Sequence, residues 1–176
     1  MSNKVITTNS AEETQEFGEQ FASQILEKKP GKKALVLALQ GDLGAGKTTF
    51  IQGFSKGLGI KEKILSPTFI LMKKFKIQNP KFQINPKSKI QKSKFTHFYH
   101  IDCYRLKNGK DLEVLDFKEI ISNPENIVAI EWPEKVKKLL PKKMVLIRFN
   151  HSIEDQRKLV IGSLSSIIEK WQKKGN

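Results

Sequence analysis

The chain has 176 residues, of which 38% are hydrophobic and 28% are charged, and its net charge is +14. These totals are typical of one domain that buries its own core, and no apolar run reaches the roughly 18 residues of a membrane span. The single cysteine, Cys103, excludes an intrachain disulfide. Together with an N-terminus that lacks the features of a secretory signal, this favours a cytoplasmic location.

The first half of the chain shows three clear elements. Residues 10–13 have the form of a capping box, in which a serine and a glutamate bond each other's backbone amides, and a helix is predicted from there to about residue 28. A Pro-Gly pair then ends it. The continuous apolar run at 34–40 predicts a buried strand of a parallel sheet, and 47–58 predicts a second helix.

The second half of the chain alternates strands with short helices. The later elements are predicted to be a turn and strand within 63–75, a strand ending near Asp102, a short helix over 111–121, a buried strand at 126–132, two antiparallel strands at 144–149 and 158–162, and a closing helix over 163–174. This order predicts a three-layer α/β domain whose sheet is mainly parallel, with antiparallel edge strands.

The basic charge is concentrated in one segment. Eight lysines and no acidic residue lie between Lys73 and Lys94, and the remaining residues carry a net charge of only +6. The chain has three arginines, although arginine is the better partner for phosphates and base edges. We therefore interpret residues 76–94 as a solvated lysine-rich insertion within a single domain over 1–176. A direct RNA contact or a docking role is the alternative.

The most specific motif lies between the first buried strand and the second helix. Residues 41–48 read GDLGAGKT and match G-x-x-x-x-G-K-[ST] at every fixed position. The glycines allow a tight turn whose N–H groups point inward, and a P-loop NTPase-like fold with ATP or GTP bound is predicted. The predicted nucleotide-binding residues of this loop are Asp42, Gly44, Ala45, Gly46, Lys47, Thr48 and Thr49.

Two carboxylates follow predicted strands. Asp102 ends the strand in HIDCYR, and Glu131 follows the apolar residues of VAIEWPE. Because a metal-bound nucleotide needs a carboxylate at a neighbouring strand end, Glu131 is the predicted Mg²⁺ ligand together with the hydroxyl of Thr48. Asp102 would orient the attacking water or hold a water of the metal's second shell. We predict Lys47, Asp102 and Glu131 as the catalytic residues; the alternative for each acid is a surface or capping role.

Four motifs in order, GDLGAGKTTF, SPTF, HIDCYR and IEWPE, resemble the TsaE (YjeE) family over nearly the whole chain. These are the P-loop ATPases of bacterial tRNA threonylcarbamoyladenosine biosynthesis. The resemblance implies a weak, Mg²⁺-dependent ATPase that acts on a TsaB–TsaD heterodimer. In that complex TsaD modifies adenosine 37 of tRNA, ATP binding favours assembly, and hydrolysis resets the complex for repeated turnover. Contact with tRNA would be indirect or weak.

The resemblance also implies residue roles. Trp132 would lie beside the nucleotide, where core packing is the alternative, and Glu134 and Arg157 would line the nucleotide pocket. Thr68 of SPTF would lie near the γ-phosphate. The chain departs from the family in its lysine-rich insertion and at Asp116-Phe117, where a Gly-Leu-like pair is common.

Two other functions are compatible with a P-loop. A nucleoside or small-molecule kinase would share the loop, but its mobile lid usually carries several arginines, which are scattered here. An RNA-binding module with incidental ATP binding would show salt-dependent affinity for tRNA. His100 lies two residues before Asp102 on the same predicted strand. It is interpreted first as a packed or hydrogen-bonded side chain, with a proton relay as the alternative.

Overall fold

We analysed a computed structural model, which describes residues 4–78, 94–106, 110–151 and 156–162. The centre of the lysine-rich insertion and the predicted closing helix lie outside these residues. Among the described helices, none combines the length and the apolar character needed to cross a membrane.

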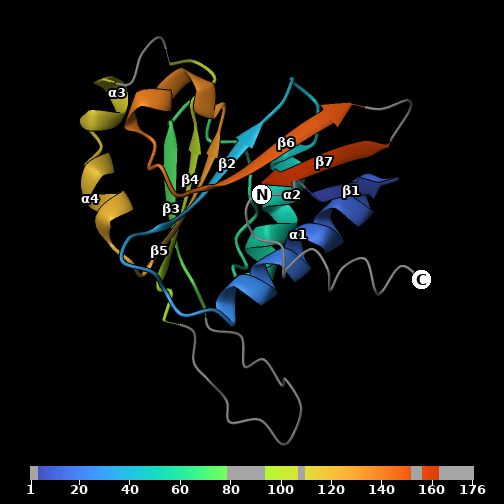
Figure 1. Cartoon of the computed structure of the whole chain (residues 1–176), viewed down its shortest axis with the longest axis horizontal. Coiled ribbons are helices and arrows are strands. Elements are labelled where there is room, and N and C mark those ends of the chain that lie inside the picture. Colours follow the sequence, from blue (N-terminus) through green and yellow to red (C-terminus); the bar gives the residue numbers. More distant parts are fainter. Residues whose placement is uncertain (1–3, 79–93, 107–109, 152–155, 163–176) are drawn as a thin grey trace, which may run out of the picture.

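The described residues form a seven-stranded sheet with helices on both faces, as Figure 1 shows. The strands are β1 (Lys4–Thr8), β2 (Leu35–Gln40), β3 (Met72–Lys76), β4 (His97–Asp102), β5 (Asn126–Glu131), β6 (Val145–His151) and β7 (Arg157–Gly162). The helices are α1 (Ala11–Leu26), α2 (Lys47–Gly57), α3 (Lys110–Glu113) and α4 (Phe117–Ser122), with a 3₁₀ segment, η1 (Pro133–Leu139).

The strand order is β1-β7-β6-β2-β5-β4-β3. The four central strands β6, β2, β5 and β4 run parallel, and antiparallel strands flank them on both sides. This confirms the predicted sheet, including the antiparallel pairing of the two late strands. Parallel strands end at one edge of a sheet, so the loops after β2, β4 and β5 meet there.

One face of the sheet is covered by α1 and α2, which pack closely against each other. Four phenylalanines of these helices form a buried aromatic cluster with ring centroids 5.8–6.3 Å apart: Phe17, Phe21, Phe50 and Phe54. A Cβ added at Gly53 would lie 1.9 Å from the carbonyl oxygen of Gln15, so the absence of a side chain sets the helix spacing. The aromatic cluster then fixes the position of α2, whose first turn belongs to the phosphate loop.

The start of α1 differs in one detail from the predicted capping box. The amide of Glu13 donates to the Ser10 hydroxyl at 3.1 Å, as expected. The Glu13 carboxylate, however, accepts from the amide of Asn9 at 2.8 Å rather than from Ser10. Ser10 is still the N-cap of α1, so the second capping hydrogen bond comes from the residue before the cap.

The opposite face is covered by α3, α4 and η1, which bury a second apolar cluster against alternate residues of the sheet. The prediction of one helix over 111–121 was wrong, because the segment is split into α3 and α4. Asp116 adopts a left-handed conformation with φ of 53°, which no α-helix interior accommodates. Glycine adopts this conformation without strain, and aspartate adopts it more readily than most other residues.

Candidate nucleotide-binding site

The phosphate-loop motif connects β2 to α2, as the sequence predicted. Gly46 is the N-cap of α2 and has φ of 95°, a conformation that favours glycine. A Cβ at Gly46 would also lie 2.7 Å from Cδ of Arg157 on β7, so the loop is packed tightly against that strand. The N–H groups of the first turn of α2 are left without helical carbonyl partners and carry the positive end of the helix dipole. The loop is therefore built to receive an anion.

Lys47 is nearly buried, and its amine lies inside the loop. Nζ donates to the carbonyl oxygens of Gly41 at 2.7 Å and Asp42 at 2.8 Å, and lies 4.1 Å from the ring centroid of Trp132. Burial lowers the pKa of Lys47, while nearby carboxylates, Glu131 first among them, oppose this effect. A bound phosphate would add the negative charge that such a partly desolvated amine lacks.

The two predicted carboxylates lie side by side. The register of β4 and β5 pairs Asp102 with Glu131, and both side chains are buried. The Thr48 hydroxyl donates to both Glu131 carboxylate oxygens, at 3.1 and 3.2 Å. Thr48 and Glu131, the predicted metal ligands, thus meet at the first turn of α2, although they are far apart in sequence.

His100 on β4 hydrogen-bonds to Glu131 on the neighbouring strand β5. Its Nε2 lies 2.8 Å from Oε1 of Glu131, and the histidine is fully buried on β4. This confirms the interpretation of His100 as a hydrogen-bonded side chain. Its role is one that sequence reasoning missed: the imidazole restricts the rotamer of the carboxylate that faces Thr48.

Asp102 is held by a different set of donors. Its Oδ2 accepts from the hydroxyls of Ser66 at 2.5 Å and Thr68 at 2.6 Å, and its Oδ1 accepts from the amide of Tyr104 at 2.9 Å. Both hydroxyls come from the SPTF segment. The carboxylate therefore connects that exposed segment to the end of β4, and Ser66 is a site residue that the motif alone did not reveal.

These side chains enclose a pocket of about 280 Å³. It is lined by Leu43, Gly44, Gly46, Lys47, Thr48, Thr49, Ser66, Thr68, Asp102, Tyr104, Glu131 and Trp132. Trp132 is half-buried, has a left-handed conformation with φ of 59°, and packs against Tyr104 with ring centroids 5.1 Å apart. The indole thus lines the pocket and also packs against the second apolar cluster.

Four of the predicted nucleotide-binding residues are not in this lining. Ala45 is a residue of the loop that is buried in the core, and Asp42 contributes its carbonyl to Lys47 while its side chain is exposed. Glu134 is exposed on η1, and Arg157 packs behind Gly46. Direct contact between these side chains and a nucleotide stays a prediction.

The oxygen atoms present suit Mg²⁺. The hydroxyl and carboxylate of Thr48 and Glu131 are hard ligands of the kind that Mg²⁺ prefers, and this ion usually binds few protein groups alongside substrate phosphates and water. Within the described residues, no group of three or more histidine, cysteine, aspartate or glutamate side chains could hold a metal alone. This donor set fits a metal that arrives with a nucleotide.

The comparisons with known proteins agree on one family. Residues 8–159 match the family model described as threonylcarbamoyl adenosine biosynthesis protein TsaE. The chain is 34% identical to a Rickettsia bellii protein named tRNA threonylcarbamoyladenosine biosynthesis protein TsaE, covering 89% of this chain and 93% of that protein. It is 33% identical to the Haemophilus influenzae protein of the same name, covering 77% and 74%.

A solved structure is also similar. The crystal structure of Bacillus subtilis YdiB superposes with a TM-score of 0.67 at 26% identity, covering 100% of this chain and 99% of that one. The fold, the phosphate loop and the sequence matches lead to one conclusion: the chain belongs to the TsaE family.

Proposed function

We propose that this protein binds and hydrolyses Mg-ATP, and that its nucleotide state controls its action on a TsaB–TsaD complex during threonylcarbamoylation of adenosine 37 in tRNA. The observation that carries the proposal is the convergence of Lys47, Thr48, Asp102 and Glu131 on one pocket at the carboxyl edge of the sheet. The family membership supplies the pathway, since relatives are named for that biosynthesis.

Each side chain in the pocket has a different role in the proposed reaction. The Lys47 amine neutralises charge on the outer phosphates, and the loop N–H groups hold their oxygens. Thr48 and Glu131 would hold Mg²⁺, which supplies charge stabilisation for the leaving group when bound. Asp102 is the carboxylate closest to the exposed segment, and it would orient the attacking water by accepting its hydrogen bond.

The contacts of Asp102 also suggest how hydrolysis is coupled to a partner. Ser66 and Thr68 hydrogen-bond to this carboxylate, and the same segment exposes the large apolar side chains of Phe69 and Ile70, which are 84% and 64% accessible. Exposed apolar groups of this size mark protein contact surfaces. A change in the hydrogen bonds of Asp102 during turnover would move the segment and alter that surface.

The decisive experiment is a multiple-turnover tRNA modification assay with TsaB, TsaD and a source of threonylcarbamoyl-adenylate. Wild-type protein should sustain repeated turnover and hydrolyse ATP faster with the partners than alone. Glu131→Ala should lose both activities. Repeated turnover that is independent of the protein would reject the proposal, and ATP-dependent phosphorylation of a nucleoside would favour a kinase instead.

A further inference from the structure

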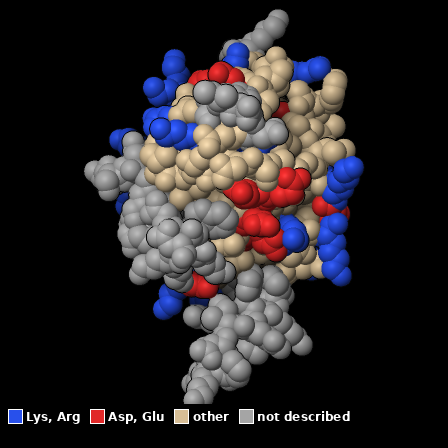
Figure 2. All heavy atoms as spheres, turned by 90° about the vertical axis from the view of Figure 1, so that its right-hand side faces the viewer, with Lys and Arg blue, Asp and Glu red and all other residues tan. Residues whose placement is uncertain are grey.

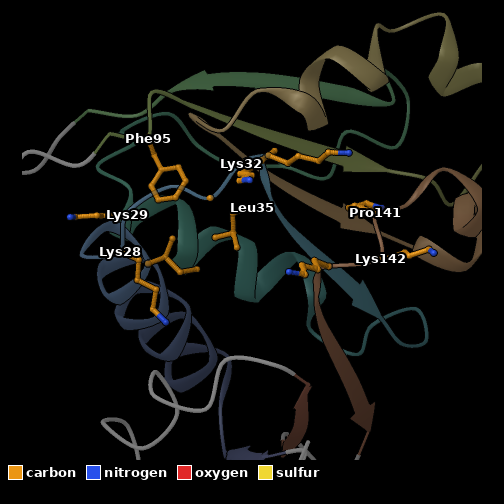
Figure 3. A pocket seen from close by; sticks show the side chains of 12 residues that line it. Lys28, Lys29, Lys32, Leu35, Phe95, Pro141 and Lys142 are labelled. Atoms are coloured by element: carbon orange, nitrogen blue, oxygen red, sulfur yellow. The ribbon is translucent and has the colours of Figure 1, made fainter.

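A second hollow, of about 740 Å³, lies at the edge of the sheet opposite the nucleotide pocket. It forms where α1 ends and where β2, β4 and β6 are about to begin, and Figure 3 shows it from close by. Its volume is in the range of pockets that bind ligands or peptide side chains. The two pockets share no lining residue.

The floor of this hollow is apolar. Ile25 and Phe95 are buried, while Leu35 and Pro141 are half-buried, and Figure 3 shows Leu35 and Phe95 directed into the space. The Phe95 side chain is only 4% accessible and belongs to the core beneath α1. With so little accessible surface, its ring offers no open face on which a flat ring could stack.

The rim of the hollow is basic. The lysines are Lys28, Lys29, Lys32, Lys33, Lys142 and Lys143. They come from two separate segments, and the labelled ones in Figure 3 spread around the apolar floor. None of the described lining residues carries a carboxylate. Lysines just after α1 complement its dipole, but this reason does not extend to the lysines before β6.

The rest of the surface is not uniformly basic. Figure 2 shows carboxylates gathered in a patch on the side of the molecule seen from the right of Figure 1. Helix α1 contributes four glutamates to the surface charge, of which the first three lie in its amino-terminal half: Glu12, Glu13, Glu16 and Glu19. The acids within α1 thus lie in its first nine residues and the lysine rim follows its end, where Glu27, the C-cap, directly precedes Lys28. An acidic partner would be steered to the rim and away from the patch.

We propose that this hollow docks an acidic peptide segment of a partner protein, whose carboxylates pair with the lysine rim and whose apolar side chains occupy the floor. Charge complementarity selects the acidic character, and the apolar floor selects a chain that also carries leucine-like or aromatic anchors. Lysine ammonium groups are flexible point charges, which suits carboxylates displayed on a peptide.

Single-stranded RNA fits the same surface less well. Proteins that bind single-stranded RNA contact its phosphates, and they also stack its bases on accessible aromatic rings or arginine side chains. Here Phe95 is buried, and no described lining residue is an arginine. The half-buried residues of the floor, Leu35 and Pro141, offer aliphatic groups, which suit apolar peptide side chains better than the planar bases of RNA.

The test is selection of random 12-residue peptides displayed on phage, using the full-length protein. The enriched peptides are synthesised with a fluorescent label, and their affinity is measured by polarisation. The pocket variant Lys32→Glu/Lys142→Glu reverses two rim charges. The matched control Lys61→Glu/Lys63→Glu reverses two exposed lysines that line neither pocket. Circular dichroism and thermal unfolding check that both variants are folded.

The proposal requires enriched peptides that combine at least two acidic residues with an apolar anchor. Their affinity should fall about tenfold or more in the pocket variant, change less than about twofold in the control, and fall when the anchor becomes serine. Failure to enrich such peptides, equal loss in the control variant, or tighter binding of a 12-nucleotide poly(U) RNA at the same rim would overturn it. Nucleotide binding is measured separately, so failure here leaves the proposed ATPase function standing.

Discussion

The two edges of the central sheet carry pockets of opposite construction. At the carboxyl edge, the groups that face the 280 Å³ pocket are held by hydrogen bonds: Glu131 by Thr48 and His100, and Asp102 by two hydroxyls and an amide. At the amino edge, the 740 Å³ hollow has an apolar floor and a rim of long lysines. Fixed polar groups suit a reaction that requires exact geometry, whereas an adaptable charged rim suits recognition of a variable chain.

The largest expected effect is a difference in how fast reagents modify side chains at the two edges of the sheet. Burial, with the charges of Asp102, Glu134 and Glu131, raises the pKa of Cys103 from 9.0 to about 12. At pH 8, iodoacetamide should therefore label the native thiol roughly a thousandfold more slowly than the urea-unfolded chain. In contrast, the rim lysines at the other edge should react readily with an amine-directed ester. Rapid labelling of native Cys103 would show that the carboxyl edge is open.

The same pKa predicts a pH dependence of stability. The unfolded thiol loses its proton near pH 9 while the folded thiol keeps it, so the free energy of unfolding should fall as the pH rises from about 9 to about 12. Cys103→Ala should remove this part of the slope in urea titrations at several pH values. An unchanged slope in the variant would assign the alkaline loss to other groups.

Removal of the loop amine should give the next largest effect. Lys47→Ala deletes the charge that faces the phosphates and should weaken ATP binding by at least about a hundredfold, measured by titration calorimetry. Lys61→Ala, an exposed lysine outside both pockets, is the matched control and should bind like wild type. Equal ATP affinity in the two variants would show that the nucleotide does not bind at this edge.

Glycine substitutions compare the frameworks behind the two pockets. A methyl group at Gly53 would overlap the backbone of Gln15, so Gly53→Ala should destabilise the fold by about 2–4 kcal/mol through separation of α1 and α2. At Gly31, which lines the lysine-rimmed hollow, the nearest atom to an added Cβ is the carbonyl oxygen of Lys33 at 3.9 Å, and alanine should change stability by less than about 1 kcal/mol. Urea unfolding of both variants measures the difference.

The smallest effect concerns coupling. Ser66→Ala/Thr68→Ala removes two hydrogen bonds to Asp102 and should lower partner-stimulated ATP hydrolysis by about tenfold. ATP affinity should change less than about threefold, because the phosphate loop is intact. A loss confined to affinity would mean that the SPTF segment serves binding rather than coupling.

The sequence was most informative where structure is local. The phosphate loop lies within eight consecutive residues, and the two acids follow recognisable apolar strands, so these site residues could be named in advance. The pairing of His100 with Glu131 depends on the register between β4 and β5, which one sequence does not contain. The same holds for Ser66 and Asp102, whose contact joins a loop to a strand end.

The features that the sequence analysis missed are all set by something other than the local residue pattern. β1 is short and polar, and it is stabilised by pairing with β7 rather than by its own pattern. Asp116 breaks a helix through a backbone conformation that its residue type does not demand. The lysine-rimmed hollow is assembled from segments that only the sheet order brings together, so its lysines looked like ordinary solvated residues.

The position of Trp132 has a practical consequence. An ammonium group lies over its indole, and the chain has only one other tryptophan, Trp171. Any displacement of that ammonium changes the electric field across the ring and hence its emission. In a Trp171→Phe background, the protein carries its own optical sensor of phosphate-loop occupancy, with no need for a labelled nucleotide.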